Sequence, residues 1–246
     1  MRGAGCTYND IVDQDLDAQV ERTALRPLPA GTVTTKQAWI WLFAQCAVGL
    51  IVLLCLPRLA QIISLASIPL VAAYPFMKRI TWWPQLWLGL TFNWAVLVAY
   101  AAKTETVSLP LFILYAGLIF WTVGYDTIYA CQDIEDDMKI GVKSTARLAR
   151  KNIARFVYHF YGLSSTLVML AIFTKLYPIG NAILGAAILI LPFGLHLRFQ
   201  SDKLKNLVEK TTYLILFKSN IRAAFLLIIS ISTYSAVERL GYFDFL

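Results

Sequence analysis

Carboxylates gather near the start of the chain, in the stretch NDIVDQDLDAQVERTALRPLPAG at positions 9–31. Within it, Asn9, Asp13 and Asp17 are spaced four residues apart. On a helix this spacing places the three side chains on one face. Like charges at that spacing destabilise an isolated helix by a few tenths of a kcal/mol, roughly 0.2–0.5 per pair. We therefore expect a cation beside this face.

A second acidic stretch, YDTIYACQDIEDDMKIGVKSTA, lies at positions 125–146. Asp133 and Asp137 are again four residues apart, and Asp126 precedes Asp133 by seven. If the segment is helical, these carboxylates also share a face. Carboxylate and amide oxygens suit hard divalent ions, so the two stretches together predict a pair of Mg²⁺ ions that carry a phosphate ligand.

Basic residues follow or face both acidic stretches. Carboxylate-bound metal combined with Arg and Lys is a common way to hold a diphosphate. Each basic residue taken singly is equally well explained as an anchor beside a membrane, whereas the whole set favours a diphosphate. The set is Arg22, Arg26, Lys78, Arg79, Lys139 and Lys143.

The composition indicates the kind of protein that positions these residues. The chain has 246 residues, of which 58% are hydrophobic and 15% charged. A soluble domain has about 25% charged residues, so this chain lacks the charge to cover a water-facing surface. Its apolar residues also come in blocks of about twenty, the length that a helix needs to cross a bilayer. The sequence predicts an all-α, polytopic transmembrane helical bundle.

We expect about seven complete transmembrane helices and a partial helix at the N-terminus, within a single domain over 1–246. Alternate loops hold most of the Lys and Arg residues, which places those loops, and both acidic stretches, on the cytoplasmic or matrix side. Topology thus accounts for the net charge of +7, and no nucleic-acid partner is expected. The predicted crossings are 37–56, 59–77, 84–102, 107–130, 152–174, 178–197 and 219–237.

A diphosphate with a lipid-soluble tail fits a site that lies half in water and half in the bilayer. The head would bind the metals, and the tail would run between apolar helices. Aromatic faces along that path could stabilise a developing cation, although each ring is also an ordinary packing residue. The candidate aromatic residues are Tyr74, Phe92, Trp94, Tyr125 and Tyr129.

Both motifs resemble those of the UbiA-type intramembrane prenyltransferases. Positions 9–17 resemble the NDxxDxxxD signature of that family, and positions 133–137 resemble its DxxxD signature. The YDxxYA opening and the IGVKS end of the second stretch are similar to the 4-hydroxybenzoate branch of ubiquinone biosynthesis. The resemblance covers the whole chain.

This resemblance implies an integral, multi-pass enzyme of the bacterial or mitochondrial inner membrane. It would transfer a polyprenyl group from polyprenyl diphosphate to the ring of 4-hydroxybenzoate. Arg22, Arg26, Lys78 and Lys143 would bind the diphosphate, and Asp126 would orient a ligand or a basic group. Two Mg²⁺ ions would be held by Asn9, Asp13, Asp17, Asp133 and Asp137, whose four aspartates would be catalytic.

Family members carry a further helix before the first motif, so we expect this chain to lack that helix and part of the acceptor site. Three explanations would account for the missing helix: a start codon misassigned to an internal Met, a broken gene, or a genuine fragment. We favour the first. Functional alternatives are a sibling prenyltransferase acting on haem, naphthoate, homogentisate or a chlorophyll-type acceptor, or a membrane transporter, since intramembrane carboxylates also mark ion pathways.

Overall fold

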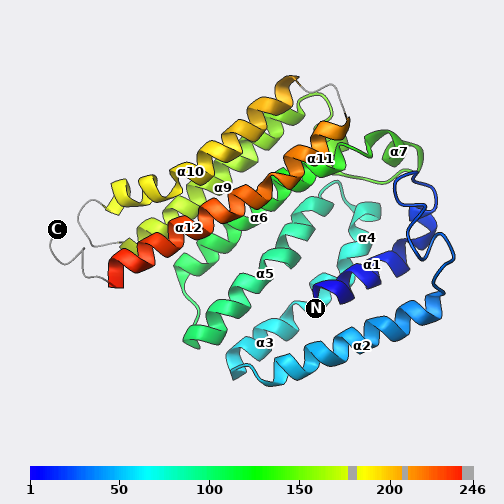
Figure 1. Ribbon diagram of the computed structural model, residues 1–246, viewed down its shortest axis with the longest axis horizontal. Helices are drawn as coiled ribbons and strands as arrows, with labels where there is room; N and C mark the ends of the chain where they lie inside the picture. Colours follow the sequence, from blue (N-terminus) through cyan, green and yellow to red (C-terminus); the bar gives the residue numbers. More distant parts are fainter. Residues whose placement is uncertain (177–181, 207–209, 240–246) are drawn as a thin grey trace. The chain divides into compact units, whose positions relative to one another are not determined.

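The protein is all-helical in the computed structural model, which describes residues 1–176, 182–206 and 210–239 (Figure 1). The chain forms two compact units. Unit 1 comprises Met1–Val107 and Asp133–Leu148, and unit 2 comprises Ser108–Gln132 and Ala149–Leu246. The all-α prediction is confirmed, while the single domain over 1–246 stays a prediction.

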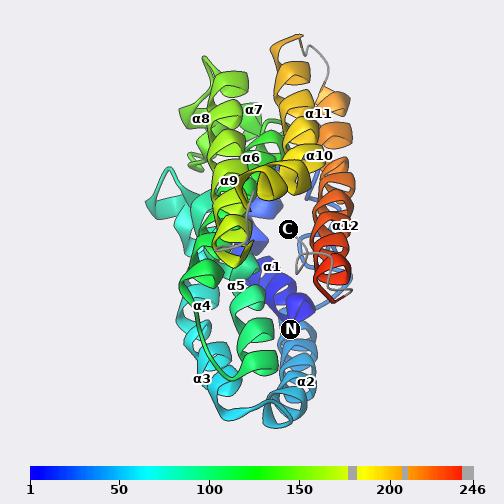
Figure 2. The same ribbon diagram turned by 90° about the vertical axis from the view of Figure 1, so that its left-hand side faces the viewer.

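Unit 1 is built from helices that surround the first acidic stretch. Helix α1 packs against α2 and α4, and α5 packs against α3 and α4 (Figures 1 and 2). The short helices α7 and α8 complete the unit, and α7 follows Asp133 and contains Asp137 of the second motif. The bounds are α1 Arg2–Asp17, α2 Thr35–Leu54, α3 Arg58–Ala66, α4 Ile68–Ile80, α5 Pro84–Thr104, α7 Ile134–Lys139 and α8 Thr145–Leu148.

Local sequence signals explain where the long helices of unit 1 begin. Thr34 and Gln37 form a reciprocal capping box at the start of α2, in which each side chain accepts a hydrogen bond from the other residue's backbone N–H. Pro84 opens α5, where its fixed φ suits the first turn and its missing N–H costs nothing. These signals fix the ends of two segments that flank the site.

Unit 2 is an assembly of long helices around one apolar core. Helix α9 lies between α6 and α10, α12 packs on α10, and α11 packs on α6. A methyl group added at Gly124 of α6 would collide with the ring of Tyr161 of α9, so the two helices approach closely because this residue has no side chain. The bounds are α6 Leu109–Ala130, α9 Ile153–Leu176, α10 Ala182–Lys203, η1 Leu204–Asn206, α11 Lys210–Lys218 and α12 Asn220–Arg239.

Apolar side chains remain exposed along the outer helices. On α2, Ile40, Phe43 and Ile51 are 60%, 63% and 65% exposed, and only Ala38 and Leu42 are buried. Contiguous exposed apolar surface of this kind is unfavourable in water and normal against lipid tails. The surface of α2 therefore supports the membrane class independently of helix length.

Six stretches of the described residues are long and apolar enough to cross a bilayer. They match six of the seven predicted crossings, with shifted ends. The predicted crossing at 178–197 begins outside the described residues, and α10 occupies its described part. Helix α1, at 16 residues, is shorter than a span. The six stretches are Thr35–Leu54, Arg58–Ile80, Pro84–Thr104, Leu109–Ala130, Ile153–Thr174 and Thr211–Thr233.

Candidate functional site

The first motif lies on α1, as its four-residue spacing predicts. Asp13 is 1% exposed and Asp17 is 7% exposed, so burying them requires compensation by cations. Helix α4 supplies it: Lys78 Nζ lies 2.7 Å from Asp13 Oδ2, and Arg79 Nη2 lies 3.4 Å from Asp13 Oδ1. Basic residues in the last turn of α4 also complement the negative end of that helix.

Asp13 Oδ2 is a buried oxygen that accepts no hydrogen bond within the described part of the chain. Lys78 Nζ and Asp13 Oδ2 therefore form an ion pair whose angles do not meet those of a hydrogen bond. A buried carboxylate oxygen that has an ion-pair partner but accepts no aligned hydrogen bond is unusual in a protein core. It is the feature expected of a carboxylate that exchanges its partner for a metal ion.

The turn that follows α1 brings two arginines back onto carboxylates. Arg26 Nη1 donates to Asp17 Oδ2 at 2.8 Å and to Asp10 Oδ1 at 3.0 Å. Thr23, which is 3% exposed, donates from its hydroxyl to the Asp17 carbonyl at 2.9 Å. The turn is therefore folded onto the end of α1.

Arg22 joins the first motif to the second. Its Nε donates to Asp133 Oδ1 at 3.0 Å, and its Nη2 donates to Asp133 Oδ2 at 2.7 Å. This is the bidentate geometry in which a guanidinium matches a carboxylate or a phosphate. Both motifs belong to unit 1, so the predicted meeting of two remote acidic stretches is observed.

The second motif sits at the start of the short helix α7. Asp133 is the N-terminal flanking residue, and the Asp137 N–H donates to its carbonyl at 2.8 Å. Burial, together with the charge of Asp133, raises the pKa of Asp137 to about 6, while Lys78, Arg147 and Arg22 act in the opposite direction. Lys78 thus acts electrostatically on a carboxylate of each motif.

The segment after α7 is fastened to the ends of α4 and α5. The Lys143 N–H donates to the Lys78 carbonyl at 2.8 Å, and Lys143 Nζ donates to the Ile80 carbonyl at 3.0 Å. The Thr145 N–H donates to Gln85 Oε1 at 3.0 Å. These contacts hold the second motif beside α4, where the cations of the first motif are found.

One spacing argument is wrong. Helix α6 ends at Ala130, before Asp133, so the seven-residue step from Asp126 to Asp133 does not run along one helix. Asp126 belongs to unit 2 on α6, whereas Asp133 belongs to unit 1. The C-terminal turn of α6, in which the Cys131 N–H bonds to the Ile128 carbonyl, ends the helix first.

The remaining predicted residues differ in their burial and in the contacts that their side chains make. Asn9 is partly buried on α1. Among the aromatic residues, Trp94 donates from its ring N–H to the Ile63 carbonyl at 2.8 Å, and Tyr129 packs on Phe217 with ring centroids 4.7 Å apart. These contacts show that Trp94 and Tyr129 pack between helices. A role of the aromatic residues beside a prenyl tail stays a prediction.

Sequence reasoning gave Gln85 and Arg147 no place in the site. Gln85 is 5% exposed and shows no charge or motif that marks it. Arg147 donates to the Asp137 carbonyl at 3.1 Å and to the Val142 carbonyl, and its Cζ lies 5.2 Å from the Trp82 ring centroid. Only its position just beyond the second motif could have singled it out.

The donor set of the site is oxygen-only, which fits Mg²⁺ better than a soft metal. Within the described ranges, no three His, Cys, Asp or Glu side chains are already grouped to hold an ion. The carboxylates instead pair with Lys78, Arg26 and Arg22. In these pairs the candidate oxygen ligands for a metal are neutralised by basic side chains.

A model of one protein family matches residues 1–221, most of the chain, and its description is the UbiA prenyltransferase family. The chain belongs to this family. The predicted resemblance is therefore confirmed, and the UbiA fold is the one that positions the two acidic motifs.

Individual relatives agree with this assignment. The 4-hydroxybenzoate polyprenyltransferase, mitochondrial, of Drosophila melanogaster is 50% identical over 147 residues, which cover 59% of this chain and 38% of that protein. The bovine protein of the same name (Bos taurus) is 49% identical over 164 residues, 65% of this chain and 43% of that protein. The chain thus spans about two fifths of the length of the curated relatives it matches.

Solved structures agree at the level of the fold. The apo structure of a UbiA homologue from Aeropyrum pernix superposes with a TM-score of 0.78 at 26% identity, covering 95% of this chain and 85% of that one. A UbiA homologue from Archaeoglobus fulgidus bound to GPP and Mg²⁺ gives a TM-score of 0.64 at 18% identity, covering 94% and 83%. The latter likeness concerns the fold alone.

Proposed function

We propose that this UbiA-family chain transfers a polyprenyl group from an allylic polyprenyl diphosphate to 4-hydroxybenzoate. The observation that carries the proposal is the bidentate contact of Arg22 with Asp133, which joins the two acidic motifs. It supports a single site that combines oxygen ligands for a metal with cations for a diphosphate. The choice of acceptor rests on relatives of about 50% identity that are named 4-hydroxybenzoate polyprenyltransferases.

Asn9, Asp13, Asp17, Asp133 and Asp137 are the residues that would hold two Mg²⁺ ions. When bound, Mg²⁺ would supply positive charge that neutralises the charge developing on the leaving diphosphate. The buried Asp13 Oδ2, which pairs with Lys78 but accepts no hydrogen bond from the described residues, supports this role. The structure of the Archaeoglobus fulgidus homologue contains both Mg²⁺ and a prenyl diphosphate, GPP, which supports the same pairing of ligands.

The basic residues of the site act on the leaving group. Arg22, Arg26 and Lys78 exchange their carboxylate partners for diphosphate oxygens. A guanidinium binds either kind of oxygen in the same geometry, and the Lys78 ammonium attracts either as a point charge. Arg79 keeps one cation beside Asp13 during this exchange. Lys143 Nζ would first have to leave the Ile80 carbonyl, so we assign it a lesser part.

Charge stabilisation by these residues drives the chemical step. The allylic C–O bond breaks, and its electron pair stays on the diphosphate oxygen, which the neighbouring cations stabilise. The ring carbon ortho to the hydroxyl of 4-hydroxybenzoate supplies the electron pair for the new C–C bond. Loss of the proton from that carbon restores aromaticity. Asp126 would orient a ligand or a basic group, as the family motif implies.

The relatives are named mitochondrial, so we place this site on the matrix side of the mitochondrial inner membrane, with the bacterial inner membrane as the corresponding location. The excess of basic residues in the same set of loops supports that orientation.

Transfer of a radiolabelled polyprenyl group to 4-hydroxybenzoate tests the proposal. The chain is expressed in membranes of a host that lacks its own 4-hydroxybenzoate prenylation, with Mg²⁺ or with EDTA. Asp17→Asn and Asp133→Asn should abolish Mg²⁺-dependent transfer. Asp136→Asn is the matched control, because Asp136 is a neighbouring carboxylate on α7 that pairs with the exposed Lys139.

Transfer that persists in EDTA, or equal activity in Asp133→Asn and Asp136→Asn, would contradict the proposed site. A panel of acceptors tests the substrate separately. If a naphthoate, homogentisate, haem or chlorophyll-type acceptor is prenylated in place of 4-hydroxybenzoate, and both aspartate variants still fail, the site is retained and the acceptor is wrong.

A further inference from the structure

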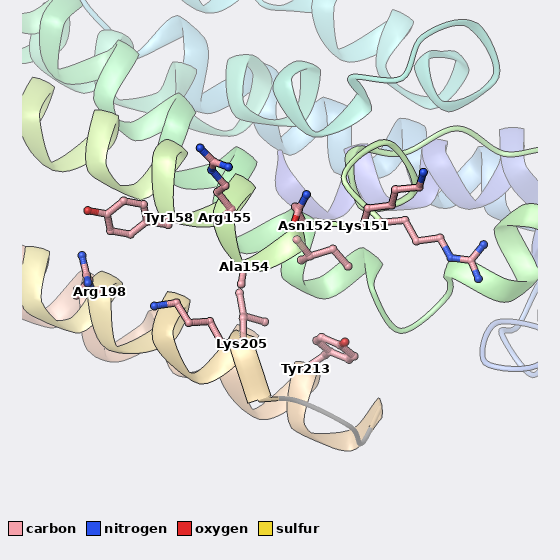
Figure 3. Close-up of a pocket in the computed structure, with 11 residues that line it drawn as sticks. Lys151, Asn152, Ala154, Arg155, Tyr158, Arg198, Lys205 and Tyr213 are labelled. Atoms are coloured by element: carbon pink, nitrogen blue, oxygen red, sulfur yellow. The ribbon is translucent and has the colours of Figure 1, made fainter.

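Unit 2 contains a pocket that the proposed reaction does not use. Its volume is about 680 Å³, and it lies where α9 begins and where α10 passes into η1 (Figure 3). Every residue that lines it belongs to unit 2, whereas the carboxylate motifs belong to unit 1. Its basic lining residues are Arg150, Lys151, Arg155, Arg198 and Lys205.

These cations exceed the carboxylates that face them. Asp202 pairs with both Arg198, at 3.0 Å, and Lys205, at 2.6 Å. Within the described ranges, no carboxylate forms an ion pair with Lys151 or Arg155. Lys151 and Arg155 therefore give the lining positive charge that no ion pair among the described residues neutralises, and this charge raises the local concentration of anions.

The polar and aromatic residues of the lining suit a phosphate ester. Figure 3 shows Arg198 and Lys205 on the α10 side of the pocket and Lys151, Arg155 and Tyr158 on the α9 side. The Arg198 guanidinium stacks on the Tyr158 ring, with Cζ 4.6 Å from the centroid, and this contact fixes the direction of its donors. Asn152 and Tyr213 add uncharged polar groups.

The position of the pocket points to a lipid rather than a free anion. It lies at one end of the candidate spans Ile153–Thr174 and Thr211–Thr233. Along α10, exposed apolar side chains spaced three or four residues apart share one face of the helix. Ile188, Leu191, Leu195 and Phe199 are 60%, 54%, 59% and 49% exposed. A headgroup in the pocket would leave its acyl chains on this stripe.

We propose that this basic pocket binds the phosphate headgroup of an anionic phospholipid, with the acyl chains along the exposed face of α10. Basic pockets at the ends of transmembrane helices are suited to headgroups with more than one phosphate. The pocket would fix unit 2 at its membrane depth. This inference is independent of the proposed transferase reaction.

Lipid retention measured by native mass spectrometry tests the proposal. The purified chain is titrated with cardiolipin, a phospholipid with two phosphates, and separately with phosphatidylcholine, glycerol phosphate and inorganic phosphate. The double variant Lys151→Gln/Arg155→Gln removes two pocket cations. The matched control, Lys36→Gln/Lys203→Gln, removes two exposed cations outside the pocket lining.

The wild-type chain and the control should retain cardiolipin, and the pocket variant should bind it roughly tenfold or more weakly. The charge-retaining variant Lys151→Arg/Arg155→Lys should bind as the wild type does, which separates lost charge from lost folding. Equal binding by the pocket variant and the control would overturn the proposal. Phosphatidylcholine bound as tightly as cardiolipin would overturn it too, as would pocket-dependent binding of glycerol phosphate or inorganic phosphate that matches cardiolipin.

Discussion

The two units handle charge in opposite ways. In unit 1 the cations of the site face carboxylates: Lys78 with Asp13, Arg26 with Asp17, and Arg22 with Asp133. In unit 2 five basic residues line the pocket at the start of α9, and Asp202, which is outside the lining, pairs with two of them, Arg198 and Lys205. Both regions suit phosphate oxygens, and the first also offers several carboxylates as ligands for a metal ion.

This difference indicates what each region can bind. A site with similar numbers of carboxylates and cations can bind a metal ion and a diphosphate together. The metal ion then pairs with the carboxylates, and the diphosphate pairs with the basic side chains. A region with excess positive charge binds an anion alone. The balance of carboxylates and cations therefore separates a site for metal-assisted chemistry from a site for a lipid headgroup.

The largest expected effect comes from removing the cation that serves both motifs. Lys78→Met leaves Asp13, 1% exposed, with only the longer contact to Arg79. It also removes a cation that acts on Asp137. We expect prenyl transfer per folded protein to fall about a hundredfold or more, as for other losses of charge stabilisation at a reacting centre.

Steady-state transfer rates in detergent-solubilised membranes measure this loss. Lys139→Met is the control, because Lys139 lies on the surface of α7 and its side chain is 74% exposed. An effect of similar size in both variants would show that general charge, rather than the place of Lys78 between the motifs, controls the reaction.

Unit 2 should respond to packing changes rather than to charge at the site. Gly124→Ala places a methyl group against the Tyr161 ring, in the core between α6 and α9. Overpacking of this kind costs about 1–3 kcal/mol. Thermal unfolding in detergent should show a lower Tm, while the activity of the folded fraction at low temperature is retained.

Gly162→Ala is the matched control on α9, because a methyl group there has nothing within 4 Å. The intrinsic helix propensity of Ala makes it neutral or stabilising by up to about 1 kcal/mol. A Tm that is unchanged in Gly124→Ala would contradict the close approach of α6 and α9.

Much of the fold and part of the candidate site could be predicted from the sequence. Blocks of apolar residues predict the crossings, because bilayer thickness fixes their length. The four-residue spacing of Asn9, Asp13 and Asp17 predicts one face of a helix, and α1 has it. The ion-pair partners of the site carboxylates could not be predicted from the sequence in the same way. Arg22, rather than another cation, binds Asp133 because of how the turn after α1 folds.

Other features of the site could not be read from spacing. The step from Asp126 to Asp133 fails because α6 ends at Ala130, and no proline or glycine in the sequence marks that end. Gln85 is an uncharged side chain whose task depends on a backbone N–H sixty positions away, at Thr145. The basic pocket depends on tertiary packing that gathers residues from α9 and α10, whose cations serve equally well as membrane anchors when considered one by one.

Removal of metal should separate the two anion sites. A prenyl thiolodiphosphate, which resists ionisation, should bind about tenfold to a hundredfold more weakly in EDTA than in Mg²⁺, because metal and diphosphate bind with positive coupling. Cardiolipin retention by the unit 2 pocket should be unchanged in EDTA. Both are measured on one preparation by native mass spectrometry, and equal metal dependence at the two sites would remove the distinction between them.

The smallest expected effect is the stability contributed by the pair of Arg22 and Asp133. Arg22 and Asp133 side chains are 38% and 16% exposed, so solvent screens much of their attraction. A double-mutant cycle with Arg22→Gln and Asp133→Asn should give a coupling below about 1 kcal/mol in denaturant unfolding. A weak pair is what the exchange requires, since the arginine must leave the carboxylate when a diphosphate and metal arrive. A coupling of about 3 kcal/mol or more would instead show that the contact of Arg22 with Asp133 mainly stabilises the fold. The diphosphate would then have to bind through the other basic residues, chiefly Arg26 and Lys78.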